Sequence, residues 1–484
     1  MWKPPEKIRW EPRVGHIPSK KEAEASRLFS SFERGRLKLS SRTWVPAMVP
    51  WRATEDGLVT RDVIDWYARF ARGKPGAIVL EATGIRDVPS GPLLRIGHDR
   101  FIPGVEELTS TIKRESGGET KVFIQLIDFL NIRRRPEREK FLSRFLEITP
   151  AYRMALGMED VEEAAVRDSL IALDDDALDE ILSERDVESL RMGYRERVTD
   201  THLPQIAELP QVLPTLFADA ARRAEKAGLD GVELHYAHAY TMASFLSATN
   251  TRNDGYGGPT ESRMRLPLEV FYAVRAVVRK DMVVGARFLA EECIEGGSAL
   301  GDVCYFATEF ARAGMDFLSL SRGGKFDDAK QPKMGAAAYP YTGPSGYECM
   351  PQFISDETGP FGRNFAATAA IRKAVHTAGF DTPVVGAGGV HNFDMAEGML
   401  HDGTADIAAS ARQTLADPDW FLKLKSGYGQ EVRHCEFTNY CEGLDQTHKQ
   451  VTCKLWDRVD LEEPGIGLSI DGKRRLTAPT WKPE

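Results

Sequence analysis

The sequence lacks a long apolar run. No stretch approaches the ~20 residues that a membrane-crossing helix needs. The opening residues, MWKPPEKIRW, carry charges and prolines where a signal peptide has an apolar core. Cysteine is also scarce, since six in 484 residues are too few for a disulfide framework. These absences lead us to expect a cytoplasmic protein with no membrane partner.

An excess of positive charge is missing as well. The 63 lysines and arginines are outnumbered by 72 aspartates and glutamates, so the formal net charge is −9. Binding to the phosphate backbone of nucleic acids needs concentrated lysine and arginine, and we therefore expect no nucleic-acid partner. A hydrophobic share of 42% and a charged share of 28% are ordinary for a globular protein with a large core.

A repeating pattern begins at residue 42. Short apolar or β-branched runs alternate with longer stretches in which apolar residues recur at three- and four-residue spacing, as in βα units around a parallel sheet. Eight such strands, alternating with helices, close into a barrel. We therefore predict an α/β protein with a (β/α)8 TIM barrel. The eight runs span residues 42–48, 76–83, 121–126, 231–240, 282–288, 316–324, 382–390 and 405–412.

Three regions fall outside this pattern. Residues 1–40 carry many charges and are expected to form an N-terminal arm or solvated tail before the barrel, which we assign to residues 41–427. A charged, helix-favouring stretch at about 131–210 predicts a helical insertion after the third strand. Loops after barrel strands lie on the catalytic face, so this insertion is a candidate lid or substrate collar. Residues 428–484 form a cysteine-containing C-terminal extension.

Residues suited to phosphate follow the seventh and eighth strands, where TIM barrels commonly hold phosphate. Gly388 and Gly389 let backbone N–H groups approach an anion closely, although glycines can also simply end a strand. Arg412, which follows Ala411 at the eighth strand end, offers a bidentate cation. The two strand ends together predict phosphate binding.

His235, His238 and Tyr240 stand at the end of the fourth strand. Side chains alternate along a strand, so positions 238 and 240 face the same side, and His235 joins them only if the strand end curls. Two imidazoles and a phenol can hold a carbonyl oxygen and deliver a proton to carbon. Either histidine alone is more often a hydrogen-bonded core residue.

The stretch VELHYAHAYTMASFLSATNTRNDGYGGPTESR, residues 232–263, resembles the Old Yellow Enzyme family of NADH:flavin oxidoreductases and ene-reductases. The resemblance extends over roughly residues 28–425. It implies bound FMN, which accepts hydride from NADH or NADPH and passes it from N5 to the β-carbon of a small α,β-unsaturated carbonyl compound. It also implies that His235 and His238 hold the carbonyl oxygen and that Tyr240 protonates the α-carbon.

The same resemblance assigns flavin-binding residues. Gln125 and Arg287 would reach the pyrimidine edge of the flavin, where a permanent cation stabilises the anionic reduced form. The phosphate would lie with Gly388, Gly389 and the last strand end. Further flavin contacts would come from Ala47, Met48, Val49, Ala82, Ser321, Gly323, Ala411 and Arg412.

Two positions depart from the family pattern. Val49 stands where the family often has a cysteine or threonine that hydrogen-bonds flavin O4, and a valine cannot make that bond. Asp128-Phe129-Leu130-Asn131 replaces the usual His-Ala-Gly-Arg after the third strand. We therefore expect the stability of the reduced flavin, and the contacts on that side of the pocket, to differ from those of familiar members.

Three cysteines follow the barrel as Cys435-x5-Cys441-x11-Cys453. The longer relatives, 2,4-dienoyl-CoA reductases and trimethylamine dehydrogenase, bind an iron–sulfur cluster here through four cysteines, and this chain has Thr438 where the second belongs. An iron–sulfur cluster, a zinc ion and a structural remnant all stay open.

The sequence leaves two alternative functions open. One is a flavoenzyme of the dienoyl-CoA reductase or amine dehydrogenase type, with a cluster and a separate electron-transfer partner. The other is a barrel that binds flavin without turnover. The natural substrate, the choice between NADH and NADPH, and the choice between monomer and homo-oligomer also stay open.

Overall fold

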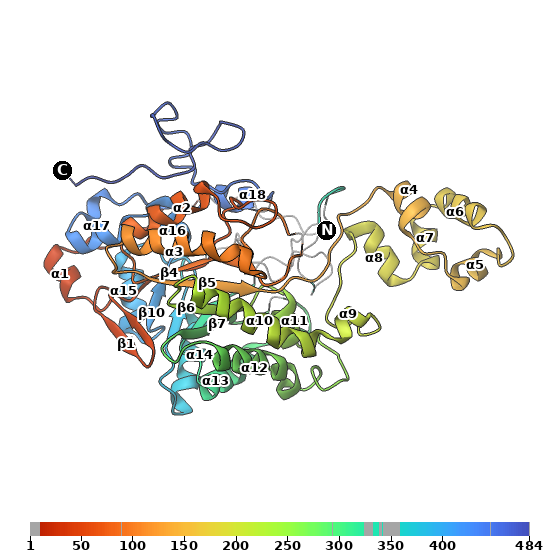
Figure 1. The fold of residues 1–484 in the computed structure, drawn as a ribbon, viewed down its shortest axis with the longest axis horizontal. Coiled ribbons are helices and arrows are strands. Elements are labelled where there is room, and N and C mark those ends of the chain that lie inside the picture. Colours follow the sequence, from red (N-terminus) through yellow and green to blue (C-terminus); the bar gives the residue numbers. More distant parts are fainter. Residues whose placement is uncertain are drawn as a thin grey trace.

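A closed barrel of eight parallel strands forms the body of the protein (Figure 1). The structure is a computed structural model that describes residues 10–88, 90–292, 294–323, 333–337, 341, 359–445 and 447–483. Each strand falls on one of the eight predicted runs, so the predicted fold class is confirmed. The strands are β3 (Thr43–Val45), β4 (Ala77–Gly84), β5 (Lys121–Ile127), β6 (Gly231–Tyr236), β7 (Val283–Leu289), β8 (Leu318–Ser321), β9 (Val384–Gly386) and β10 (Ile407–Ala409).

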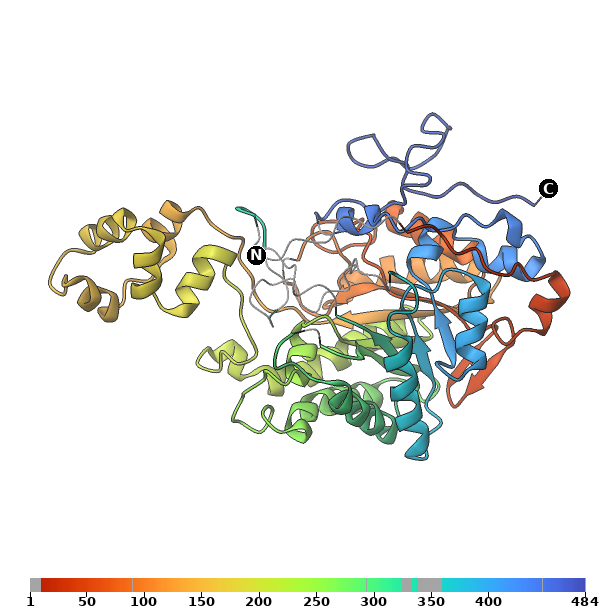
Figure 2. The same cartoon turned by 180° about the vertical axis from the view of Figure 1, so that it is seen from behind.

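Helices surround this barrel (Figure 2). Their buried residues recur at helical spacing, as Leu213, Phe217 and Ala221 do in α10, so each helix turns one apolar stripe towards the strands. In the part of the chain that the structure describes, no helix is long and apolar enough to cross a membrane. The outer helices are α2 (Arg61–Arg72), α3 (Ile102–Glu115), α10 (Leu209–Lys226), α12 (Thr260–Val277), α13 (Leu300–Ala313), α14 (Phe365–Thr377), α15 (Phe393–His401) and α17 (Trp420–Ser426).

Shorter helices lie at the ends of the chain and in the loops. Several of them are single turns that follow barrel strands or join the outer helices. They are α1 (Lys20–Ala25), η1 (Asp99–Phe101), α9 (Pro204–Ala207), α11 (Thr241–Leu246), α16 (Arg412–Ala416), η3 (Gly429–Glu431) and α18 (Tyr440–Asp445).

A hairpin precedes the barrel within the predicted N-terminal arm. Strands β1 (Phe32–Arg34) and β2 (Leu37–Leu39) pair in antiparallel fashion. Their buried side chains join one apolar cluster with Trp44 and Phe123 near the starts of barrel strands. The hairpin therefore covers the N-terminal end of the barrel, which the charged character of residues 1–40 did not predict.

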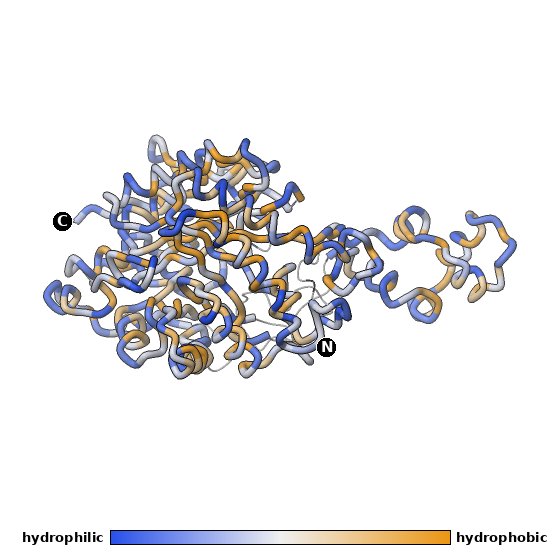
Figure 3. The backbone as a smooth tube through the Cα atoms, turned by 60° about the horizontal axis from the view of Figure 1, so that its bottom comes forward, coloured by the Kyte–Doolittle hydropathy of each residue, from blue (hydrophilic) through white to orange (hydrophobic). Residues whose placement is uncertain are grey.

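A helical insertion leaves the barrel after β5 and extends away from it (Figures 1 and 2). Apolar residues recur along its short helices (Figure 3) and bury one another in a separate cluster that includes Phe141, Leu170 and Leu190. It is therefore a small module with its own core, and a role as lid or collar stays a prediction. Its elements are α4 (Arg138–Lys140), η2 (Phe141–Phe145), α5 (Pro150–Leu156), α6 (Glu163–Ala172), α7 (Asp175–Ile181) and α8 (Glu184–Met192).

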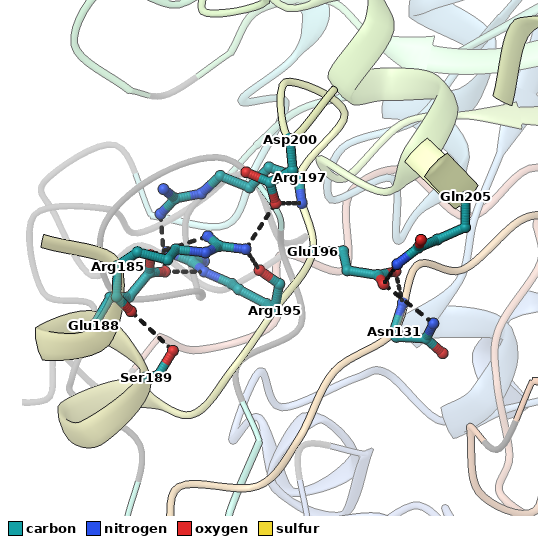
Figure 4. A network of polar contacts seen from close by, with 9 residues as sticks. All are labelled: Asn131, Arg185, Glu188, Ser189, Arg195, Glu196, Arg197, Asp200 and Gln205. Carbon is teal, nitrogen blue, oxygen red and sulfur yellow. Dashed lines mark hydrogen bonds and ion pairs between the residues drawn. The ribbon is translucent and has the colours of Figure 1, made fainter. Parts of the chain in front are cut away.

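Polar contacts close the root of this insertion (Figure 4). Buried Glu196 accepts hydrogen bonds from the backbone N–H of Asn131 at 2.9 Å and from Gln205 Nε2 at 2.9 Å. The N–H of Glu196 donates back to the Asn131 carbonyl at 2.9 Å. Glu196 therefore joins the outgoing and returning chains where they meet the barrel.

Arginines continue this network toward the module (Figure 4). Glu188 on α8 pairs with Arg195 at 2.6 Å and with Arg197 at 2.8 Å. Arg185 links Glu188 to Asp200, whose carboxylate it reaches at 2.7 Å. The last helix of the insertion is thus fastened to the returning chain by side chains rather than by an apolar core.

We expect Glu196→Ala to loosen the insertion without unfolding the barrel. The change leaves several hydrogen-bond donors without an acceptor. It should destabilise the attachment of the insertion by about 2 kcal/mol, because hydrogen bonds to charged groups are worth ~1.5–3 kcal/mol each. Trypsin cleavage at Arg133 and Arg134 should accelerate. Glu184→Ala, at an exposed position on α8, is the matched control. Equal cleavage rates for both variants would contradict this role of Glu196.

Candidate flavin and substrate site

Two histidines and a tyrosine meet at the end of β6. His235 Nε2 and His238 Nδ1 are 3.3 Å apart, and both side chains are buried. The Tyr240 ring lies with its centre 5.6 Å from that of His235 and meets Phe129 edge to face at 5.3 Å. The three predicted catalytic side chains therefore lie in one place.

The path of the backbone explains this meeting. Strand β6 ends at Tyr236, four residues before the predicted end, and His238 and Ala239 have φ angles of +59° and +57°. This left-handed backbone conformation reverses the chain locally, and residues other than glycine seldom adopt it. The strand end curls, so His235 joins the group, and the prediction that positions 238 and 240 share a strand face was wrong.

Ser321 connects the histidines to Arg287. His238 Nε2 lies 2.8 Å from Ser321 Oγ, and Arg287 donates to the same hydroxyl at 3.3 Å and to Ser319 Oγ at 3.1 Å. Strand register brings these residues together, because His235 lies opposite Arg287 on β7 and Arg287 lies opposite Ser319 on β8. A polar layer thus crosses three strands at the barrel mouth.

Glu233 on β6 adds a carboxyl group to this layer, and Gln125 extends it to β5. Glu233 Oε1 accepts a hydrogen bond from Gln125 Nε2 at 2.6 Å, and the two residues lie opposite each other on β6 and β5. Glu233 has no exposed surface. The VELH stretch contained the signal, since a charged residue two positions before His235 points to the same side of the strand.

Burial keeps the histidines neutral. Loss of solvent and the nearby Arg287 cation lower the pKa of His235 to about 3, and the pKa of His238 is also lowered well below its usual value, first by burial. Neutral imidazoles each carry one N–H that can hold a carbonyl oxygen. The pair can therefore offer hydrogen bonds over the whole physiological pH range.

These shifts predict an acid-sensitive fold. In the unfolded chain each histidine has a pKa of ~6.5. Above that pH the histidines are neutral in both states, so their burial does not lower the free energy of unfolding. The free energy of unfolding decreases as pH falls from there towards the folded pKa of about 3 for His235. The decrease is up to ~1.4 kcal/mol per pH unit for each histidine. Urea unfolding of His235→Gln should show a flatter pH dependence between about pH 6.5 and 4 than the parent chain. His376→Gln, on the exposed side of α14, should retain the parent slope.

A second polar group surrounds the turn after β9. Gly388 and Gly389 have φ angles of +127° and +80°, and a Cβ on Gly389 would lie 1.7 Å from the Pro360 carbonyl oxygen. Asn364, at the N-terminus of α14, is buried. Within the residues that the structure describes, it makes no side-chain capping bond, and its amide N and O have no partners. Such an unsatisfied buried amide beside a helix N-terminus fits a polar or anionic ligand group.

His391 and Arg412 lie around the same turn. His391 Nδ1 is 2.9 Å from the Gly389 carbonyl oxygen, and its Nε2 is buried without a partner. Arg412 donates to Asn439 at 2.9 Å, and its guanidinium lies 5.2 Å from the centre of the Phe437 ring, which also contacts His391. The C-terminal extension therefore holds Arg412 in place. Sequence reasoning missed Asn364 and His391.

The chain is similar in sequence to proteins of a known family. The sequence profile of the NADH:flavin oxidoreductase / NADH oxidase family matches residues 172–350, which include His235, His238 and Tyr240. The NADH oxidase of Thermoanaerobacter brockii is 30% identical over 413 residues, which are 84% of this chain and 52% of that protein. This similarity extends over most of the chain. The predicted resemblance to Old Yellow Enzyme is thereby confirmed.

Solved structures of lower sequence identity support the barrel fold. The Old Yellow Enzyme homologue of Zymomonas mobilis has a TM-score of 0.52 and 22% identity, and covers 82% of this chain and 91% of its own. A 2-naphthoyl-CoA reductase complex has a TM-score of 0.65 and 19% identity, and covers 91% of this chain and 58% of its own. The chain spans about half the length of the curated relatives that head the comparison, such as the NADH oxidase.

The remaining predicted flavin contacts of the family pattern lie at strand ends. Ala47, Met48 and Val49 follow β3 and are half-buried, and Ala82 lies at a bulge of β4. Gly323 follows β8 and Ala411 precedes α16. No contact in the structure tests their role, and they stay predictions.

The cysteines of the C-terminal extension do not form a metal site as they stand. Cys435, Cys441 and Cys453 are free thiols close enough to influence one another, and burial raises the pKa of Cys441 and of Cys453 to about 12. No group of three or more histidine, cysteine, aspartate or glutamate side chains within the described ranges is arranged to hold a metal ion. These three cysteines, with Thr438 where the second of the relatives' four cysteines belongs, do not fit a preassembled cluster.

Proposed function

We propose that the protein is an FMN-dependent oxidoreductase that reduces the activated double bond of α,β-unsaturated carbonyl compounds with NADH or NADPH. The observation that carries the proposal is the contact chain from Arg287 through Ser321 to the paired histidines, with Tyr240 beside them. The family supplies the flavin chemistry, and the unpartnered amide of Asn364 near Gly388 fits a polar group of FMN.

Bound FMN would supply the carrier that accepts a hydride from the nicotinamide and donates it to the β-carbon. The neutral histidines hold the carbonyl oxygen and draw charge away from the double bond. Tyr240 holds the proton for the α-carbon at its phenol oxygen. Two C–H bonds form as the π bond breaks, and the nicotinamide is oxidised, so electrons balance.

Arg287 and Gln125 would lie at the pyrimidine edge of the flavin, as the polar layer suggests. The Arg287 guanidinium is a permanent cation in a low-dielectric environment and favours an anionic reduced flavin. Gly388, Gly389, Asn364 and Arg412 would hold the phosphate. Phe129 packs against Tyr240 and would narrow the substrate pocket on that side.

An anaerobic titration tests the proposal. We expect protein reconstituted with FMN to be yellow, to lose its flavin absorbance on adding NADH or NADPH, and to regain it on adding 2-cyclohexenone. A protein that takes up no FMN would disprove the proposal. Flavin that binds and resists nicotinamide would instead favour the barrel without turnover.

The flavoenzyme alternative with a cluster and a separate electron partner stays a prediction. It is less favoured, because the described cysteines do not form a ligand set. Location in the cytoplasm and assembly into a homo-oligomer also stay predictions, measurable by fractionation and light scattering.

A further inference from the structure

Glu233 is a buried carboxyl group that the proposed reaction leaves unused. It has no exposed surface, and it lies on β6 two residues before His235. Its Oε1 accepts the hydrogen bond from Gln125 Nε2 at 2.6 Å, and its Oε2 is buried with no hydrogen-bond partner of ordinary geometry in the described part of the chain. A buried carboxylate oxygen without a donor is costly and calls for a physical reason.

Arg287 supplies part of that reason. Arg287 is buried, and its hydrogen bonds go to the hydroxyls of Ser319 and Ser321, with no ion pair to a carboxylate among the described residues. Burial lowers the pKa of Arg287, and the charge of Glu233 opposes that shift. Glu233 thus acts as the counter-charge of a cation that it does not touch.

Ser319 stands between the two charges. Its hydroxyl accepts from Arg287 at 3.1 Å and also favours the ionised form of Glu233. Burial raises the pKa of Glu233, whereas Arg287, Gln125 and Ser319 lower it. Because Ser319 separates the guanidinium of Arg287 from the carboxylate of Glu233, the guanidinium can face the barrel mouth while the carboxylate lies deeper in the barrel.

Gln125 depends on the same carboxylate. An ionised carboxylate only accepts hydrogen bonds, so it selects the Nε2 end of the Gln125 amide. That leaves the amide oxygen and the second N–H hydrogen for other partners. Loss of the negative charge would permit the opposite orientation of the amide.

We propose that Glu233 is a positioning residue that sets the reduction potential of the bound flavin, by offsetting the charge of Arg287 and by orienting Gln125. The inference rests on the proposed function. Negative charge behind Arg287 weakens the stabilisation of an anionic reduced flavin, so Glu233 holds the potential lower than Arg287 alone would set it. The flavin then gives up its hydride more readily to the substrate.

The test is the midpoint potential of the FMN-loaded protein. We expect Glu233→Gln to raise the potential by at least about 30 mV, which corresponds to a tenfold change in the ratio of reduced to oxidised flavin for a two-electron couple. Spectroscopic titration against a reference dye measures it. Reduction by NADPH should become faster and reoxidation by enone slower, a split that general loss of structure does not produce.

Glu81→Gln is the matched control. Glu81 is equally buried on β4, which β5 separates from β6. It accepts a hydrogen bond from the Leu94 N–H at 3.1 Å and lies beside the Tyr67 hydroxyl on α2. It faces the outer helices rather than the polar layer. We expect its replacement to change stability and to leave the potential unchanged.

Ser319→Ala keeps the test decisive if Glu233→Gln does not fold. Losing this hydroxyl disfavours the ionised carboxylate, so the potential should rise in the same direction by a smaller amount. An unchanged or lowered potential in the variant that folds would overturn the inference while the proposed function stands. Parent protein that binds no FMN would overturn the proposed function first.

Discussion

Tyr240→Phe slows reoxidation of the reduced flavin by an enone about a hundredfold or more and leaves reduction by NADPH nearly unchanged. This result is expected because a positioned proton donor typically contributes ~10²–10⁴-fold, and only the half-reaction that protonates the α-carbon needs it. Tyr240 lies beside His235, so its hydroxyl can reach the substrate that the histidines hold. Stopped-flow measurement of each half-reaction separates the two rates.

Tyr236→Phe provides the matched control. Tyr236 is a buried tyrosine at the end of β6, four residues before Tyr240, but its hydroxyl donates to the Pro267 carbonyl on α12 at 3.0 Å, outside the pocket. Removing that hydroxyl should cost about 1 kcal/mol of stability and leave both half-reactions intact. Equal losses in both half-reactions of Tyr240→Phe would count against its role as proton donor.

Arg287→Met is expected to have the largest effect on both stability and flavin binding. It removes the counter-charge of Glu233, and an uncompensated buried charge typically costs ~3–5 kcal/mol. It also removes hydrogen bonds from a charged donor to bound FMN, worth ~1.5–3 kcal/mol each. We expect the unfolding free energy of the FMN-free protein to fall by about 3 kcal/mol and the FMN affinity to fall at least tenfold.

The pH dependence of this loss identifies its cause. Burial already raises the pKa of Glu233 in the parent fold, and loss of Arg287 raises it further. The extra loss of stability therefore begins as pH rises through the parent's pKa of Glu233 and is complete above the pKa of Glu233 in the variant. The double variant Arg287→Met with Glu233→Gln should recover most of the stability at neutral pH and none of the FMN affinity. A loss that is independent of pH and persists in the double variant would refute the charge pairing.

Particular strands show how far the sequence predicts this fold. Strands β4 to β7 are buried on both faces and are mostly apolar in sequence, so the barrel was predictable from local pattern alone. The hairpin β1–β2 was not, because three-residue strands carry too little pattern to stand out among charges.

The candidate site was predictable only where its residues are neighbours in the chain. His235, His238 and Tyr240 fall within six residues, and a motif of that density is recognisable. Glu233, Ser319, Asn364 and His391 were missed. Each of these residues matters because of a partner on another strand or helix. The pattern of a single sequence does not show which residues of distant segments lie close together in space.

The sequence by itself determined the eight strands, because the burial of alternating strands and helices requires a repeating apolar pattern, which a single chain displays. It also determined the resemblance to the Old Yellow Enzyme family, which rests on the dense motif after the fourth strand. Only the tertiary structure decided which polar groups share the barrel mouth. Strand register places Glu233 beside Gln125 and His235 beside Arg287, and the left-handed turn at His238 brings the second imidazole back to the first. Register and backbone reversal are set by the packing of the whole barrel, so no local stretch of residues specifies them.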